Sequence, residues 1–170
     1  MKRIKHTWLW ILVVILIFIF IVLSPAFVGT RPLTETEQKL AERIFEQSLD
    51  YNNIQINTGG PLTWIYPAVT TGNTISFPKG NYNQTDKKSQ ALLLHELTHV
   101  WQYQNYGWGY LPRAVFEEIS QSDAYVIHFD ESKSFRDYDI EEQAEIVAEY
   151  FLTNNEKYLP YIAELTAKRF

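Results

Sequence analysis

The sequence predicts an α+β fold, in which a mostly helical domain with a small β-sheet before its central helix follows one N-terminal transmembrane helix. Three observations support this fold class. A long apolar run opens the chain, short β-prone runs with turn residues occupy about residues 51–83, and apolar residues recur at helical spacing in most of the remaining chain. We therefore divide the chain into residues 1–30, a cytoplasmic tip and membrane anchor, and residues 31–170, one folded domain.

The N-terminal run is apolar enough to suggest a membrane span. Between Lys5 and Arg31 the only titratable side chain is His6. Roughly 20 apolar residues can cross a bilayer as a helix, and the basic residues before them place the N-terminus in the cytoplasm. We expect a single-pass protein of the inner or cell membrane whose domain is periplasmic or extracellular. The alternative is a signal peptide cleaved near Ser24.

The charge and the lack of cysteine exclude some classes of function. Three of the 15 Lys and Arg residues, but none of the 20 Asp and Glu residues, precede residue 31, so residues 31–170 carry a formal charge of −8. Such a charge argues against nucleic acid as a partner. The chain has no cysteine, which excludes disulfides and thiolate metal sites.

The first part of the domain combines a helix with short strands. A helix is expected over about residues 35–49, because Thr34 and Glu37 form a capping box ahead of helically spaced apolar residues. The β-prone runs after it are Ile54–Ile56, Thr63–Tyr66 and Thr74–Phe77. TTGN at residues 70–73 is typical of a hairpin turn between the last two.

Helices make up the rest of the domain. The central one is expected over about residues 87–105, ending before Gly107. Asp139 and Glu142 form a second capping box before the strongly helical stretch IEEQAEIVAEYFLT. Three helices are expected after the central one. They cover Arg113–Val126, the stretch IEEQAEIVAEYFLT that begins at Ile140, and about residues 155–168.

The central helix carries HELTH at residues 95–99, a match to H-E-x-x-H. Residues i and i+4 lie one turn apart on one helix face, so His95 and His99 can present ring nitrogens to one tetrahedral zinc ion. Glu96 lies beside that position, where it can take a proton from an activated water and pass it to a leaving amine. The alternative is that both histidines are hydrogen-bonded core residues without a metal.

A catalytic zinc ion needs a third protein ligand and one open position. The acidic helix offers Glu141 and Glu145, which lie one turn apart on one face, whereas Glu142 and Glu149 point elsewhere. One of the pair can bind zinc while the other accepts the second N–H of a ligand histidine. For any single glutamate here, the alternative is a solvated helix face.

These residues resemble a known family. HELTH followed by EEQAE at residues 141–145 is similar to the gluzincin pattern of HExxH and a later E-x-x-A-[DN]. The resemblance implies that Glu141 is the third zinc ligand, while Glu145 stands where those proteins have Asp or Asn. Over about residues 85–152 the chain also resembles small bacterial zincin-like proteins related to Vgr and Rhs proteins of contractile secretion systems. This implies a zincin-like domain, Zn²⁺ as cofactor and secretion-system components as candidate partners.

The HELTH motif, the resemblance and the apolar N-terminal run together predict a membrane-anchored zinc metallopeptidase of the gluzincin type, acting on a peptide or protein substrate. His95, His99 and Glu141 would bind zinc, and Glu96 would be the general base and acid. Zincins commonly bind substrate along the edge strand before the active helix, so Thr74–Phe77 is the candidate strand, and the alternative is that it belongs to an ordinary hairpin. An alternative is a non-catalytic zinc-binding accessory or scaffold protein of a secretion or toxin locus. Another is a toxin delivered to other cells, and the sequence does not name the substrate.

Overall fold

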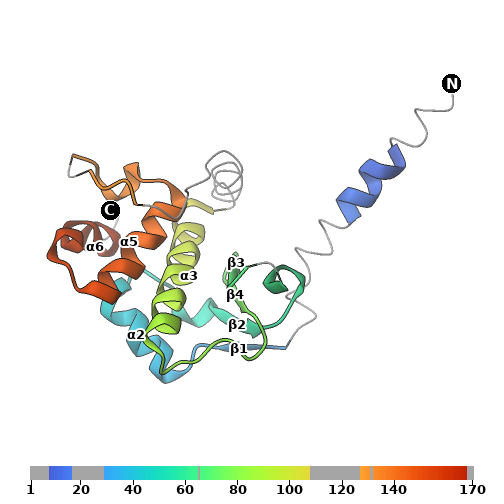
Figure 1. The fold of residues 1–170 in the computed structure, drawn as a ribbon, viewed down its shortest axis with the longest axis horizontal. Coiled ribbons are helices and arrows are strands. Elements are labelled where there is room, and N and C mark those ends of the chain that lie inside the picture. The colour runs from blue at the N-terminus through green and yellow to red at the C-terminus, as the bar shows by residue number, and fades with distance from the viewer. Residues whose placement is uncertain (1–7, 17–28, 65, 108–126, 131, 168–170) are drawn as a thin grey trace.

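The computed structural model of the chain describes residues 8–16, 29–64, 66–107, 127–130 and 132–167. The main elements of the domain are β1 (Thr30–Pro32), α2 (Glu35–Phe45), β2 (Gln55–Thr58), β3 (Val69–Thr71), β4 (Thr74–Phe77), α3 (Lys87–Tyr106), α5 (Ile140–Thr153) and α6 (Leu159–Thr166). Helix α3 lies at the centre, with the sheet on one side and α5 on the other (Figure 1). The α+β part of the predicted fold class is confirmed.

The sheet has four strands in the order β1-β2-β4-β3. β2 pairs in parallel with β4, while β1 and β3 pair antiparallel with β2 and β4. β4 therefore lies inside the sheet, so the expectation that Thr74–Phe77 is the edge strand is wrong. The strand at that edge is β3, which the turn at Gly72 joins to β4. In the run Thr63–Tyr66, Thr63 and Trp64 belong to the 3-10 helix Pro61–Trp64 and not to a strand, and residue 65 lies outside the described residues.

The two central helices begin and end where local capping predicts. Asp86 accepts a hydrogen bond from the backbone N–H of Ser89 at the start of α3, and Gly107, at φ 66°, ends it. The Asp139–Glu142 capping box is present at the start of α5. These signals lie within a few residues of each helix end, which is why the sequence alone locates the two helices.

Other predicted helices differ in extent. The Thr34 capping box is present, but α2 ends at Phe45 because Glu46 adopts a positive φ of 48°. The last segment divides into a 3-10 turn and α6. The helix expected over Arg113–Val126 lies entirely within residues 108–126, which are outside the described residues.

The N-terminal helix corrects the predicted membrane anchor. Where the chain is described, this helix covers residues 8–16. Residues 1–7 and 17–28 lie outside the described part. Within the described part, no helix is both long and apolar enough to cross a bilayer. The predicted transmembrane helix, and the single-pass membrane localisation that depended on it, are therefore wrong.

One hydrophobic core joins the sheet to the helices. Ile56 and Ile75 from the sheet belong to the same buried cluster as Leu94 and Leu97 of α3 and Val147 of α5. Because α3 is packed on both sides, the residues of HELTH are buried along with the leucines around them. The core therefore holds the motif between the sheet and α5.

Shortening Leu97 to alanine tests whether α3 is the centre of this core. Leu97 is fully buried, so Leu97→Ala should lower the free energy of unfolding by about 2–5 kcal/mol. The control is Leu159→Ala, at a side chain that is 46% exposed, which should change it by about 0.5 kcal/mol or less. Chemical denaturation of the full chain measures both, and equal losses would contradict the packing described.

Candidate metal centre

The two histidines of α3 meet inside the domain. His95 and His99 are each 7% exposed, and their Nε2 atoms lie 3.3 Å apart. They come together because they are four residues apart on one helix, as the motif predicts. Packing of Leu94 and Leu97 into the core fixes the rotation of α3, so the histidine face is directed towards α5.

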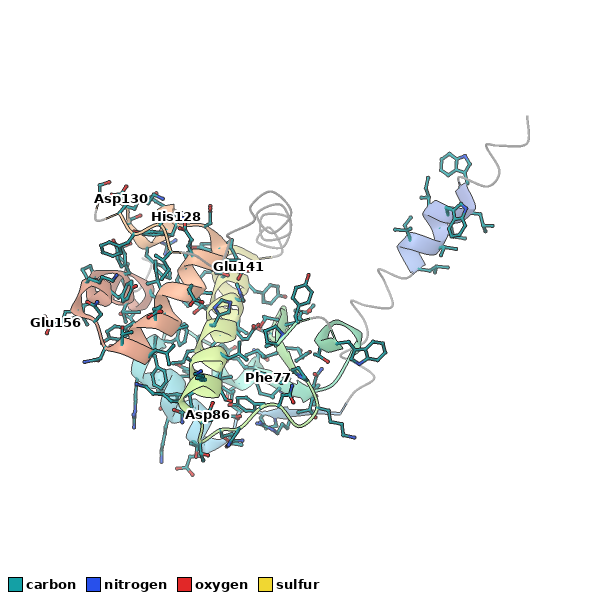
Figure 2. The ribbon with its side chains drawn as sticks, in the orientation of Figure 1. Phe77, Asp86, His128, Asp130, Glu141 and Glu156 are labelled. Carbon is teal, nitrogen blue, oxygen red and sulfur yellow. The ribbon has the colours of Figure 1, made fainter. Side chains whose placement is uncertain are left out.

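Helix α5 supplies the third group. Oε2 of Glu141 lies 3.3 Å from Nε2 of His95 and 3.4 Å from Nε2 of His99. Figure 2 labels Glu141 at the start of α5, beside α3. His95, His99 and Glu141 thus form a cluster that could hold a metal ion. The cluster consists of the three residues predicted as ligands.

The neighbouring glutamates of α5 have other contacts. Oε2 of Glu145 lies 3.4 Å from Nδ1 of His95, where it can accept the second N–H of this histidine, the role predicted for it. Glu142 accepts hydrogen bonds from the backbone N–H groups of Asp139 and His128 instead. Among the candidates for third ligand, the structure therefore brings Glu141 into the cluster and gives Glu142 a capping role.

His99 has a partner that the sequence did not suggest. Its Nδ1 lies 2.8 Å from Oε1 of Gln102, which is fully buried. Gln102 follows His99 by three residues, so both lie on the same helix face. This spacing could have indicated a contact between Gln102 and His99, but a glutamine at this position could equally have been a solvent-exposed polar residue.

The predicted general base is held from the sheet. Thr70 on β3 donates its hydroxyl hydrogen to Oε2 of Glu96 at 2.7 Å, and its Oγ1 also lies 3.2 Å from the carbonyl oxygen of Glu96. Glu96 is 5% exposed. Nothing in the sequence indicates this contact, because it joins residues from two elements that are 26 positions apart.

The cluster shifts the pKa values of its members in opposite directions. Burial lowers the pKa of His95, but hydrogen bonds to Glu141 and Glu145 outweigh this effect and raise it to about 10. The pKa of His99 is also raised, since the contact with Glu141 outweighs burial. Burial raises the pKa of Glu141, but its hydrogen bonds to both histidines hold it well below the usual range. The metal-free cluster is therefore an ion-paired group at neutral pH.

Comparisons with known proteins identify relatives of this domain. Residues 65–107 match the family model of the eCIS core domain. Over 137 residues the chain is 31% identical to the type VI secretion system spike protein VgrG2b of Pseudomonas aeruginosa, covering 74% of this chain and 13% of that protein. The solved structure of the effector domain of Pseudomonas aeruginosa VgrG2b has a TM-score of 0.65 and 28% identity, covering 80% of this chain and 82% of that one.

The chain is therefore related to the VgrG2b effector domain, although it spans about an eighth of the length of the spike protein itself. This confirms the Vgr-related part of the predicted resemblance. The relatives agree better with the alternative prediction, a protein of a secretion or toxin locus, than with a membrane-anchored peptidase. Peptide hydrolysis and the identity of the metal stay predictions.

The pKa shifts predict that metal binding releases protons. A pKa of about 10 keeps His95 protonated at pH 7 in the metal-free chain, and a metal ion binds only the neutral ring. We expect at least one proton to be released per metal ion at pH 7, and affinity to increase with pH towards about 10. The raised pKa also stabilises the metal-free fold below pH 6.5, and this contribution is lost as pH rises to about 10.

Titration calorimetry of the full chain with Zn²⁺, in buffers of different ionisation enthalpy, measures this release. His128→Ala is the control, because the His128 side chain is 57% exposed and belongs to the Glu142 cap instead. It should leave the number of released protons unchanged. Metal binding at pH 7 without proton release would contradict the ion-paired description of the cluster.

Proposed function

We propose that this chain is a zinc-dependent hydrolase of peptide bonds, in an effector-type domain related to that of VgrG2b. His95, His99 and Glu141 would hold the zinc ion. Glu96 would act first as general base and then as general acid. By analogy with its relatives, we further propose that the domain works with components of a contractile secretion system.

The observation that carries this proposal is the size of the donor triangle. Its three sides measure 3.3, 3.3 and 3.4 Å. A tetrahedral zinc shell with bonds of about 2.0–2.1 Å places neighbouring ligand atoms about 3.3–3.4 Å apart. Two imidazoles and one carboxylate are also a common ligand set for catalytic zinc. The residues present therefore fit zinc in both donor type and spacing.

The chain's own groups are suited to move a proton. A zinc ion held by the three ligands supplies Lewis acidity, which makes water more acidic and polarises a carbonyl group. Glu96 follows His95 directly on α3, and its carboxylate is kept in one orientation by Thr70. From there Glu96 can take the proton of the attacking water and deliver it to the nitrogen of the leaving amine. A structural metal site has no use for such a carboxylate.

The position of β3 supports a peptide as substrate. The outer edge of β3 pairs with no other strand of the described chain, and the strand packs against α3. An extended peptide can add to such an edge through main-chain hydrogen bonds. Because Thr70 of β3 bonds to Glu96, a peptide on this edge would lie next to the general base.

The second candidate function is a non-catalytic, zinc-binding accessory or scaffold role in a secretion system. The relationship to a type VI secretion system spike protein and to the eCIS core domain favours a role in a secretion system. Both functions require the same metal ligands. They differ in whether Glu96 is needed for turnover.

Metal content and peptide cleavage of the full chain test the two functions together. We expect one zinc ion per chain in wild type, its loss in His95→Ala and Glu141→Gln, and full retention in Glu96→Gln. Glu96→Gln should lower cleavage of a peptide library by about a hundredfold or more, because the general base is gone. Glu149→Gln is the matched control on α5, about 12 Å further along the helix, and should leave both quantities unchanged.

The outcomes separate the candidates. Zinc bound through the three ligands, with no cleavage of any peptide by wild type, would favour the accessory role. A wild-type chain that binds no zinc after reconstitution would exclude both functions and leave the histidines as core residues.

Removing the Thr70 hydroxyl tests how Glu96 is oriented. Thr70→Val keeps the shape of the side chain but loses a hydrogen bond to a carboxylate, so kcat should decrease by about tenfold while zinc content stays at wild-type level. Thr71→Val is the control, because successive strand side chains point to opposite faces. Equal kcat values for the two variants, measured with the best library peptide, would show that Thr70 does not act through Glu96.

A further inference from the structure

We propose that Gln102 is a positioning residue of the metal site, which fixes the ring of His99 in the form that binds metal and holds the start of α5 in place. This inference rests on the proposed zinc site. It concerns a buried group of two amides, Gln102 and Gln143, that the hydrolytic chemistry does not use. Both side chains are fully buried between α3 and α5.

The orientation of the Gln102 amide is set by a backbone group. Its Nε2 donates to the carbonyl oxygen of Ile140 at 2.9 Å. A carbonyl oxygen only accepts hydrogen bonds, so the nitrogen end of the amide must face Ile140. Oε1 is therefore the end that faces His99, at 2.8 Å from Nδ1.

Gln143 supports the same orientation from α5. Its Nε2 donates to the carbonyl oxygen of Tyr138 at 2.8 Å, which directs its Oε1 towards Gln102. The second N–H of Gln102 then donates to this Oε1 at 3.1 Å. Two backbone carbonyls thus fix the orientation of both amides. A flip of either amide would place its oxygen against a buried carbonyl oxygen, with no hydrogen between the two acceptors.

This orientation decides which ring nitrogen of His99 carries hydrogen. Oε1 of Gln102 is an acceptor, so Nδ1 of His99 must be the donor. In the neutral ring the lone pair is then on Nε2, the atom that faces His95 and Glu141. Gln102 therefore prepares His99 to bind metal through Nε2.

The two ligand histidines are held differently. Nδ1 of His95 lies 3.4 Å from Glu145, whose side chain is 29% exposed, whereas Nδ1 of His99 lies 2.8 Å from a fully buried amide. A buried, short hydrogen bond restricts the ring more than a longer one near solvent. His99 is thus the more rigid of the two ligands.

Gln102 also acts on the third ligand. The backbone groups that its network binds, at Ile140 and Tyr138, lie one and three positions before Glu141. The Gln102 side chain therefore sets the distance between His99 on α3 and the first turn of α5, which carries Glu141. Loss of the network should disturb two of the three ligands at once.

Zinc affinity separates a positioning role from a purely structural one. The full chain would be compared as wild type, Gln102→Met, Gln102→Glu and Gln104→Met, by competition with a chelator of known affinity and by thermal melting. Gln104→Met is the matched control, because Gln104 lies on the same helix and is hydrogen-bonded to Asp50 and Asn73, away from the cluster. Gln102→Met should weaken zinc binding by about 10–100-fold, and Gln104→Met should leave it unchanged.

Gln102→Glu divides the two functions of the side chain. A carboxylate can still accept the Nδ1 hydrogen of His99, but it cannot donate to Ile140 and Gln143. We expect zinc affinity between that of wild type and that of Gln102→Met, because the contact with His99 is kept while the hold on α5 is lost. We also expect a lower melting temperature and a hydrogen-bonded His99 Nδ1–H signal in ¹⁵N-edited NMR of the zinc-loaded chain. That signal should be absent in Gln102→Met.

Equal zinc affinity in wild type and Gln102→Met would overturn this inference alone. A wild-type chain that binds no zinc would overturn the proposed function with it. If Gln102→Met does not fold, Gln102→Glu decides the question, since the absence of a hydrogen-bonded His99 Nδ1–H signal in its zinc-loaded form would contradict the acceptor role.

Discussion

The contact on which the rest of this structure depends joins two buried imidazoles of α3 to one carboxylate of α5. Burying His95 and His99, with Glu141 partly buried beside them, costs several kcal/mol unless their charges and hydrogen bonds are compensated. Protons on the histidines provide this compensation in the metal-free chain, and a bound cation would provide it in the metal-bound one. In both states the attraction acts at the same point between α3 and α5. The site and the packing of the two helices are therefore one feature of the domain.

Most of the site could be predicted because its information is local. His95 and His99 need only a helix and a spacing of four, and Asp86, Gly107 and the Asp139 capping box specify the two helices over short distances. The prediction of Glu141 as a ligand required one long-range assumption, that α5 packs against α3. The choice of Glu141 over Glu145 came from a family pattern. Glu142 was set aside because it points to another face of the helix, and in the structure its carboxylate caps that helix.

The parts that could not be predicted depend on contacts between distant segments. β3 is at the edge of the sheet because β2 pairs in parallel with β4. The residues of Val69–Thr71 indicate neither the edge position nor this pairing. Thr70 and Gln102 are polar residues like many others until the fold brings them to Glu96 and His99. The N-terminal prediction rested on hydropathy alone, whereas a membrane span also needs a sufficiently long apolar helix, and the described residues contain none.

Three elements meet at the cluster, and each has a separate task. Helix α3 supplies two ligands and Glu96, α5 supplies Glu141 and Glu145, and β3 supplies the hydroxyl that orients Glu96. A peptide added at the edge of β3 would touch the element that holds the base without displacing either ligand helix. The candidate metal ligands are held by the core, whereas Glu96 is held from the edge strand β3. Binding at that edge can therefore adjust the position of Glu96 while the metal geometry stays constant, which is a reason for a minimal domain to keep these two tasks on different elements.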